Sequence, residues 1–166
     1  MQYQEGKAKF IDTWGDLGTR WGVSRTMAQV HAVLLLSPSP LCAEDIMVEL
    51  AISRGNVSMR LNMLQEWDII SKLAVPGDRR EFYLAEKDMW KVLKRIIQHR
   101  KQKELDPMLQ ALDEVSAVEG LCENSREFCK MVKEIKHFSQ KAEVVLDKFV
   151  RVDDHWLANG FMKMIR

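Results

Sequence analysis

Residues 52–67 read ISRGNVSMRLNMLQEW, and they decide how the middle of the chain folds. Ser53 is a strong helix N-cap, because its hydroxyl can accept a hydrogen bond from a first-turn amide that has no partner within the helix. Val57, Leu61 and Leu64 follow at the spacing of one helix face. The pattern predicts a helix that starts after the cap and buries a single apolar face.

The opposite face of this helix carries hydrogen-bonding side chains of moderate length: Arg54, Asn56, Ser58, Arg60 and Asn62. No acidic residue occurs within the helix before Glu66. A face that is merely solvated usually mixes Lys with Glu, because opposite charges four residues apart stabilise a helix. The composition therefore indicates a surface that binds a negatively charged partner.

The segments around this helix follow a defined order. Residues 43–50 predict a short helix, residues 51–52 a tight turn, and residues 54–67 the polar-faced helix. The runs IISKLAV and EFYLA are rich in β-branched and aromatic residues, and the PGDRR between them favours a turn, so they predict a β-hairpin. This order is that of a winged helix-turn-helix. The expected fold class is mainly α with a small β-hairpin wing.

Further helices are predicted on both sides of this unit. Residues 5–20 carry an apolar stripe, and Ser24 caps a second helix, which the prolines of SPSP end because they lack an amide donor. Helical spacing resumes at Glu86. Asp106, followed directly by a proline, predicts the start of a new helix that runs to about Val118.

The longest helix is predicted from a cap at Ser125 to about Val150. Its residues at alternating spacings of four and three form the pattern of a seam between two helices. These residues are Phe128, Val132, Ile135, Ser139, Ala142, Leu146 and Phe149. The seam could pack on its own domain or form a dimer interface, and we favour the dimer because so long a helix needs a partner surface. A last short helix would hold Trp156, Leu157 and Phe161.

The expected domains are a winged helix-turn-helix with its N-terminal helix over 1–105 and a helical dimerisation region over 106–166. With 166 residues, 46% of them apolar, the chain can bury a core. A net charge of +1 excludes a polycation that binds nucleic acid everywhere, so such a surface must be a local patch. No apolar run approaches the about 20 residues that span a bilayer. The N-terminus lacks the apolar segment of a signal peptide, and we expect a cytoplasmic protein.

Cysteine usage and absent motifs argue against catalysis. Cys42, Cys122 and Cys129 fit neither a disulfide scaffold nor a zinc site, and we expect reduced, mostly buried thiols, with a redox pair of Cys122 and Cys129 as the alternative. The sequence contains no glycine-rich phosphate loop, no GxSxG and no HExxH. We therefore expect no enzymatic activity, no metal and no cofactor.

The polar-faced helix fits the major groove of double-stranded DNA, where its N-terminal turns can offer Arg, Asn and Ser to base edges. Arg79 and Arg80 at the hairpin tip could reach phosphates or the narrow minor groove, while Asp78 would hold their guanidinium groups. The candidate DNA-binding residues are Ser53, Arg54, Asn56, Ser58, Arg60, Lys72, Arg79 and Arg80.

Two features leave alternatives open. Residues 41–85 hold five Lys or Arg against seven Asp or Glu, a net charge of −2, and a winged helix can also serve as a protein-docking module without DNA. A basic helix beyond the hairpin could add phosphate contacts or could simply be solvated. Its basic residues are Lys91, Lys94, Arg95, Arg100, Lys101 and Lys103.

Four stretches resemble the GbsR branch of the MarR-type transcriptional regulators: FIDTWGDLGTRWGVSRT, LLLSPSPL, SRGNVSMRLNMLQEW and VPGDRREFYLAEKDMW. The similarity covers residues 7 to about 118. It implies a homodimeric winged-helix repressor acting on a palindromic operator. Several proteins of this branch control genes for choline uptake or glycine betaine metabolism, and some sense such quaternary ammonium solutes directly.

The chain departs from that branch at two places. Ala28, Gln29 and His31 stand where its members commonly carry Gly-Arg and then Tyr. Asp68 follows Trp67 where they usually have glycine, and aspartate tolerates the left-handed conformation that such a position needs.

A quaternary ammonium group has no hydrogen-bond donor, so proteins bind it with aromatic faces. The candidate ligand-binding residues are Phe10, Trp14, Trp21 and Trp90. Their alternative fate is that of large core residues. The alternative function is a constitutive DNA-binding regulator that senses no ligand.

Overall fold

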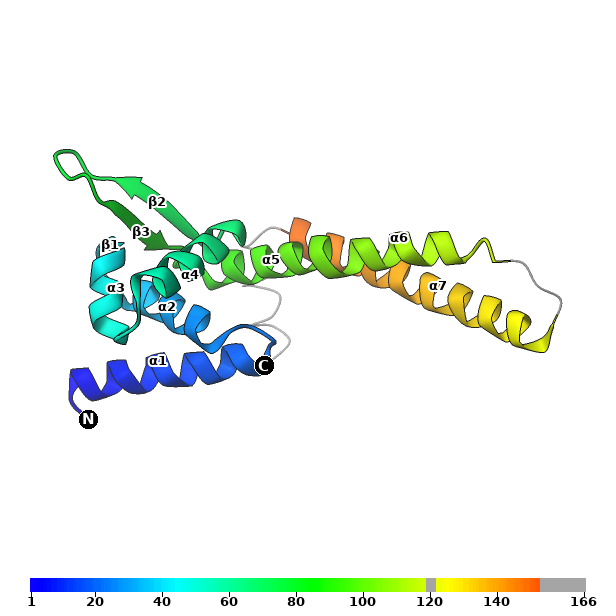
Figure 1. Ribbon diagram of the computed structural model, residues 1–166, viewed down its shortest axis with the longest axis horizontal. Helices are drawn as coiled ribbons and strands as arrows, with labels where there is room; N and C mark the ends of the chain where they lie inside the picture. Colours follow the sequence, from blue (N-terminus) through cyan, green and yellow to red (C-terminus); the bar gives the residue numbers. More distant parts are fainter. Residues whose placement is uncertain (119–121, 153–166) are drawn as a thin grey trace. The chain divides into compact units, whose positions relative to one another are not determined.

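The computed structural model describes residues 1–118 and 122–152 (Figure 1). This part of the chain is mainly helical with a three-stranded antiparallel sheet, which confirms the expected fold class. It divides into two compact units, Met1–Val92 and the residues from Leu93 onward. The short helix expected around Trp156, Leu157 and Phe161 lies outside the described residues. The division of labour between a DNA-binding and a dimerisation region stays a prediction.

Two helices open the first unit. Helix α1 (Tyr3–Arg20) packs against α2 (Arg25–Leu36), and the Ser24 hydroxyl caps α2 by accepting a hydrogen bond from the Met27 amide at 3.4 Å, as expected. The two backbones approach closely at Gly18, where an added Cβ would lie 2.5 Å from the Cβ of Ala28. No side chain fits there unless one of the helices moves.

The helix-turn-helix consists of α3 (Ala43–Leu50) and α4 (Arg54–Glu66). The turn between them passes through Ala51, which adopts a left-handed conformation with φ of 51°. Helix α4 ends one residue before the expected Trp67. Its predicted apolar face is confirmed, since Val57, Leu61 and Leu64 are all at most 1% exposed.

The sheet has the strand order β1–β3–β2, with β1 (Leu41–Cys42), β2 (Ile70–Ala74) and β3 (Glu81–Ala85). The predicted hairpin of β2 and β3 pairs Lys72 with Tyr83, and Gly77 with φ of 85° turns the chain between the strands. Strand β1 was not expected, because two residues are too few to show a period. Asp68, just before β2, has φ of 56°, as expected of a left-handed residue.

The segment after β3 is tied to the end of α2 by Lys87. Its ammonium group donates to the main-chain carbonyls of Leu34, Leu35 and Ser37 at 3.0, 2.5 and 2.8 Å. The last carbonyls of a helix have no partner within it, and a cation there also interacts favourably with the helix dipole. Lys87 therefore fixes the exit of the first unit against its core helix.

The helix that leaves the first unit is continuous where a new start was expected. Helix α5 (Met89–Arg100) passes through a π-helical turn, η1 (Lys101–Leu105), into α6 (Asp106–Val115). The prediction that Asp106 caps a separate helix is wrong. The Asp106 amide bonds to the carbonyl of Lys101, and this wider π turn lets the chain stay helical as it enters Pro107, which has no amide donor.

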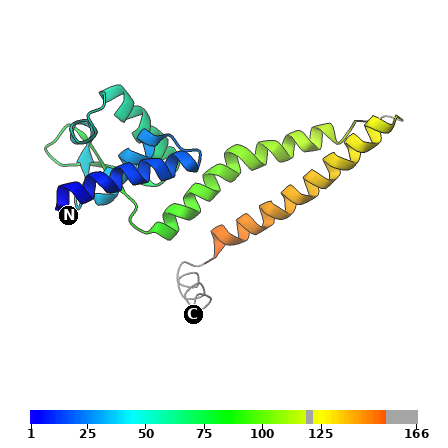
Figure 2. The same ribbon diagram turned by 90° about the horizontal axis from the view of Figure 1, so that it is seen from below.

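Helix α7 (Glu123–Arg151) runs back along α6 in the second unit (Figure 2). It begins two residues before the predicted cap, and Ser125 lies in its first turn with its hydroxyl donating to the carbonyl of Cys122 at 2.7 Å. Only part of the predicted seam is covered within the chain. Val132 and Ser139 are buried, whereas Phe128 and Ile135 are exposed.

A half-buried lysine, Lys101, joins the two arms of this unit. The Lys101 ammonium lies 3.1 Å from Asp106 Oδ1, 3.1 Å from Glu143 Oε1 and 3.5 Å from Asp147 Oδ1. These carboxylates raise the Lys101 pKa above its usual value, chiefly through the hydrogen bond to Glu143. The Lys101 ammonium is thus held by carboxylates of its own chain, which argues against it as one of the phosphate contacts considered for the basic helix. None of the described helices combines the length and the apolar character needed to cross a membrane.

Because the helices approach closely at Gly18, a side chain at this position should disturb their packing. Gly6, in the same helix, provides a matched control. Gly18→Ala should lower the free energy of unfolding by about 1–3 kcal/mol, because the new methyl group overlaps Ala28. Gly6→Ala should instead raise it by about 0.5–1 kcal/mol, because the nearest atom, Met1 Sδ, is 3.6 Å away and alanine favours a helix. Urea unfolding measures both changes. Equal effects of the two substitutions would contradict the packing argument.

Candidate DNA interface

The exposed face of α4 carries the predicted reading residues. Arg54 is the first helical residue, and its guanidinium Nη2 lies 3.0 Å from Glu44 Oε1 of α3. Ser58 and Asn62 are exposed on the same helix. The ion pair orients Arg54 across the helix-turn-helix. The role of Glu44 is not predictable from the sequence, because nothing in a sequence pairs residues ten positions apart on different helices.

Asn56 and Arg60 form a pair along the helix. The Arg60 Nε donates to Asn56 Oδ1 at 3.2 Å, and its Nη1 contacts Met63 Sδ at 3.5 Å. The arginine fork is therefore held in line with the helix axis. An amide and a guanidinium joined in this way can present adjacent donors to a base pair, since each type alone makes bidentate contacts with a purine.

The N-terminus of α4 is open. The Ser53 hydroxyl accepts from the Asn56 amide at 3.4 Å, so the predicted cap is confirmed. An added Cβ at Gly55 would meet no atom within 4 Å. The first turn thus combines main-chain N–H groups, which favour phosphate oxygens, with a surface free of side chain.

The wing tip is organised by Asp78 and Arg80. Arg80 donates from Nη2 to Asp78 Oδ2 at 2.6 Å and from its main-chain N–H to Asp78 Oδ1 at 2.9 Å. Its guanidinium carbon lies 5.3 Å from the centre of the Phe82 ring, and Nη1 is 3.6 Å from the thiol of Cys42. The hydrogen bonds from Arg80 hold the pKa of Asp78 at about 2, so this carboxylate stays ionised. The tip is thereby tied to β1.

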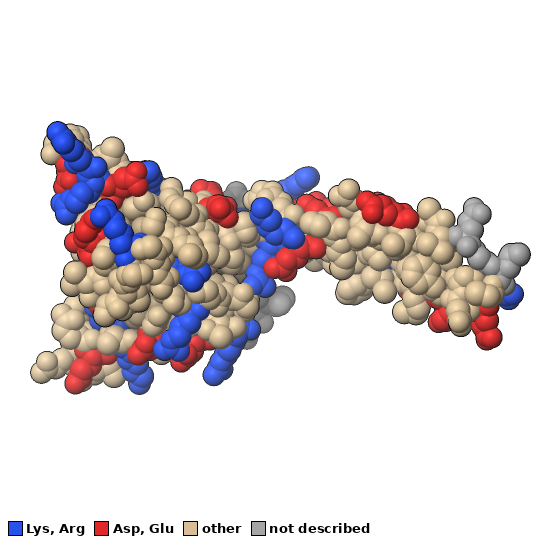
Figure 3. All heavy atoms as spheres, viewed as in Figure 1, with Lys and Arg blue, Asp and Glu red and all other residues tan. Residues whose placement is uncertain are grey.

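The two wing arginines therefore differ. Asp78 was expected to hold both guanidinium groups, but the hydrogen bonds found join it to the side chain of Arg80 alone. Arg79 is exposed, and its side chain makes no hydrogen bond or ion pair with the residues that the structure describes. Lys72, on β2, is paired with Glu81 at 2.5 Å. Figure 3 shows basic side chains at the wing tip with acidic ones beside them.

The aromatic candidates for a ligand site lie on α1, directly after it and at the start of α5. Phe10 and Trp14 stack with their ring centres 5.4 Å apart, and Trp14 lies 6.2 Å from the His31 ring of α2. Trp21 follows the last residue of α1 and is 55% exposed, while Trp90 is half-buried in the first turn of α5. The stacked pair is brought together as expected. A site formed by all four rings stays a prediction.

His31 is the unusual group beside these rings. It is 4% exposed, and its Nε2 has no hydrogen-bond partner in the part of the chain that the structure describes. Burial, helped by the positive charge of Lys87, lowers the His31 pKa to about 4. The imidazole is thus neutral at neutral pH, and its buried nitrogen costs stability because it has lost its water.

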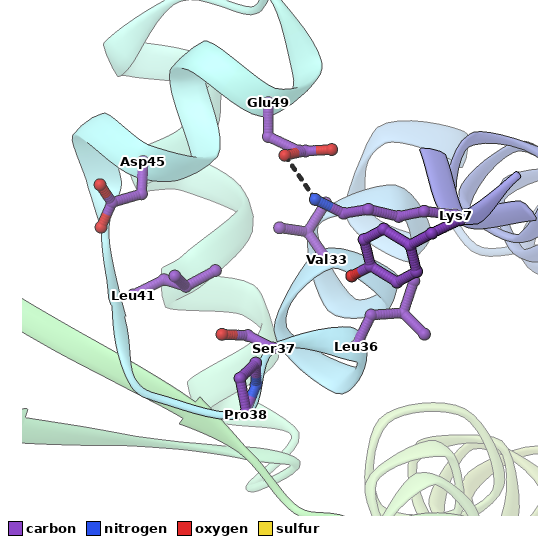
Figure 4. Close-up of a pocket in the computed structure, with 9 residues that line it drawn as sticks. Lys7, Val33, Leu36, Ser37, Pro38, Leu41, Asp45 and Glu49 are labelled. Atoms are coloured by element: carbon purple, nitrogen blue, oxygen red, sulfur yellow. Dashed lines mark ion pairs between the residues drawn. The ribbon is translucent and has the colours of Figure 1, made fainter. Parts of the chain in front are cut away.

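A cavity of about 140 Å³ lies between α1, α2 and α3. Figure 4 shows Lys7 reaching across it to Glu49, and the Lys7 Nζ lies 2.6 Å from Glu49 Oε2. None of the four candidate ligand residues lines this cavity. Its paired charges hold α1 to the helix-turn-helix, and it has the wrong character for an aromatic cage.

Comparisons with known proteins agree with this geometry. Residues 28–72 match the family model described as "Bacterial regulatory protein, arsR family". No curated protein matches the chain. A solved structure titled "Crystal Structure of a transcriptional regulator" aligns with a TM-score of 0.65 and 21% identity, over 87% of this chain and 95% of that chain. At that identity the likeness shows the fold alone.

Two further structures are less similar. A mutant of S. aureus MepR bound to an oligodeoxyribonucleotide aligns with a TM-score of 0.41 and 18% identity, over 81% of this chain and 91% of that one. The regulator Tm0710 from Thermotoga maritima aligns at 0.42 and 15%, over 85% and 94%. These scores are too low to add to the assignment. The fold is a winged helix-turn-helix, and the resemblance to the GbsR branch stays a prediction.

The buried His31 predicts a stability that falls in mild acid. The unfolded chain binds a proton near pH 6.5, whereas the folded chain binds it only near pH 4, so protonation favours unfolding between these values. Between pH 7 and pH 5 this group should remove about 2 kcal/mol of the free energy of unfolding. Urea titrations of wild type and His31→Gln would measure the loss, with the exposed His137→Gln as control. An unchanged pH dependence in His31→Gln would contradict the assignment.

Proposed function

We propose that this protein is a sequence-specific DNA-binding regulator of transcription, with α4 as the helix that reads the major groove. One observation carries the proposal: α4 buries Val57, Leu61 and Leu64 completely and directs Arg54, Asn56 and Arg60 away from the core. A helix with one face fixed in a core and the other lined by base-reading side chains is what a helix-turn-helix presents to DNA. The match of residues 28–72 to a regulatory-protein model supports the same function.

The proposed contacts divide into reading and positioning. Arg54 and Arg60 suit the O6 and N7 atoms of guanine, and Asn56 suits adenine. The N-terminal amides of α4, with Ser53 and Ser58, would meet phosphates, as would Lys72. Arg79 would extend from the wing to the backbone or the minor groove. Phosphate contacts would set the position of the protein, while α4 would supply the sequence preference.

We propose further that the protein acts as a homodimeric repressor on a palindromic operator. Two reading heads bind a palindrome when a dimer spaces them by about one turn of DNA, roughly 34 Å. Repeated selection from a random double-stranded DNA library tests the proposal, because a reading helix should enrich one palindromic sequence. Failure to enrich any sequence would overturn it and would leave protein docking as the use of the winged helix.

Gly55 offers a sharper test, because a glycine within α4 lowers the stability of the helix. Glycine weakens a helix, yet no atom of the protein is close enough to exclude a side chain there. Close approach of the DNA backbone to the first turn of α4 explains why a side chain would be harmful.

Gly55→Ala should therefore have opposite effects on stability and on binding. We expect the free energy of unfolding to rise by up to about 0.5–1 kcal/mol, and the affinity for the selected operator to fall. Gly6→Ala, in α1, is the matched control that should gain stability without losing affinity. Thermal unfolding and fluorescence anisotropy give the two readouts. If the affinity of Gly55→Ala for the operator is unchanged, the DNA backbone does not approach the first turn of α4 closely.

The wing arginines should separate in the same assay. Arg79→Ala should lower affinity about equally for operator and random DNA, reduce the salt dependence by about one phosphate contact, and leave unfolding unchanged. Arg80→Ala should also lower the free energy of unfolding, since Arg80 ties the tip to Asp78 and Cys42. Identical behaviour of the two variants would contradict the distinction between them.

The regulator is also proposed to respond to a quaternary ammonium osmolyte such as choline or glycine betaine. The proposal rests on the resemblance to the GbsR branch and on the aromatic residues Phe10, Trp14, Trp21 and Trp90, since aromatic rings are what such a cation requires. Choline should change operator affinity in wild type but not in Trp21→Leu. Leu17→Ala, at an exposed residue of α1, is the control. If wild type ignores both solutes, the protein is a constitutive regulator.

A further inference from the structure

The outer face of α7 carries a row of exposed apolar side chains. Its members are Phe128, Met131, Ile135, Phe138 and Val145, and Ala142 continues their spacing. Phe138 is 73% exposed and Val145 is 65% exposed. The spacings alternate between three and four residues, as in the contact line of a two-helix seam. We call this row the outer stripe. Such a continuous apolar surface marks a contact with another molecule.

The stripe is additional to the packing of α7 within its own chain. The inner face of α7 buries Val132 and Ser139, and Lys136 lies 2.6 Å from Asp113 of α6. Glu143 and Asp147, on the same side, bind Lys101. The helical hairpin therefore uses one face of α7, and the outer stripe needs a different partner.

Charged residues at seven-residue spacing line one edge of the outer stripe. They are Glu127 and Glu134 in the first half of α7, and Lys141 and Lys148 in the second half. Glu134, Lys141 and Lys148 form no ion pair with any described residue, and Glu127 makes a contact of 3.8 Å with Lys130 of its own helix. This edge thus offers unpaired charges of both signs in separate halves.

The order of the charges selects one orientation of a second α7. In a parallel pair this edge would meet the opposite edge of the other helix, where Val132 and Ser139 are already covered by their own hairpin. In an antiparallel pair this edge faces the same edge of the second helix, which runs in the opposite direction. Glu127 then faces Lys148 of the partner subunit, and Glu134 faces Lys141 of the partner subunit. Both pairs are centred on the same point of the helix, between His137 and Phe138, as a single two-fold axis requires.

We propose that the outer stripe binds the outer stripe of a second copy of this chain, antiparallel, with the two-fold axis beside Phe138. The most exposed aromatic ring of α7 is then buried against its own symmetry mate. This inference deepens the proposed function, because it names the surface that joins two reading heads. Its test contains no DNA, so its failure can be told apart from a failure of DNA binding.

Charge reversal tests the pairing. Glu134→Lys or Lys141→Glu alone places like charges opposite each other twice in each dimer, and should weaken self-association roughly tenfold or more at low salt. The double variant Glu134→Lys/Lys141→Glu should restore the affinity, because every pair is again of opposite sign. Lys133→Glu, at an exposed position away from the stripe, is the control. Sedimentation equilibrium measures the dissociation constants.

Crosslinking tests the orientation. In a Cys122→Ser/Cys129→Ser background, Phe138→Cys should form a disulfide with its own copy on mild oxidation, because the axis brings the two positions within bonding distance. Phe128→Cys should not, because its copy would lie about 30 Å away along an antiparallel pair. The background protein, which keeps only the buried Cys42, is the control.

The outcomes are distinct. Restoration by the double variant, with crosslinking at position 138 alone, supports the proposal. Crosslinking at both positions would show a parallel pair, and a double variant as weak as the single ones would remove the charge pairing. Either result overturns the proposal. A wild-type protein that sediments as a monomer at micromolar concentration overturns it as well. The outer stripe would then pack against another surface of the same chain.

Discussion

The burial of Val57, Leu61 and Leu64 fixes the rotation of α4 about its axis, and the candidate interface depends on that rotation. A helix that buries one narrow face can turn little without exposing apolar surface, at a cost of about 25 cal/mol for each Å². The directions of Arg54 and Asn56 are therefore set by residues on the other side of the helix. Since α4 is polar overall, the core below it, and not its own helix propensity, keeps it in place.

The interface is also neutralised from within. Arg54 is paired with Glu44, Lys72 with Glu81 and Arg80 with Asp78. Exposed ion pairs are worth about 0–1 kcal/mol each, so a phosphate can replace a carboxylate at little cost. In the free protein these carboxylates orient the basic side chains. These three pairs add no net charge, so the net charge of −2 over residues 41–85 comes from the remaining four acidic and two basic residues.

The local features were predictable from the sequence, whereas the contacts between distant segments were not. The Ser53 cap, the buried face of α4 and the left-handed Asp68 follow from residue types and spacing, because neighbouring residues determine them. Strand β1 exists only because β3 pairs with it, and the Glu44–Arg54 pair depends on how α3 meets α4. The carboxylates that hold Lys101 were likewise not predictable, because two of them come from α7, some forty residues later.

A single reading head has few free contacts with which to hold DNA, and this makes a second copy necessary to the proposed function. Of the basic groups on α4 and the wing, Arg79 alone makes no polar contact with the described residues, and the others must exchange partners. Joining two heads converts the second binding event into an intramolecular one at an effective concentration of about a millimolar. The gain requires that the dissociation constant of the dimer lie below the concentration of the protein. An apolar seam with matched charges can supply an association of that strength. Tight binding of DNA by α4 would thus depend on dimerisation through the outer stripe of α7, where large apolar side chains are exposed to solvent.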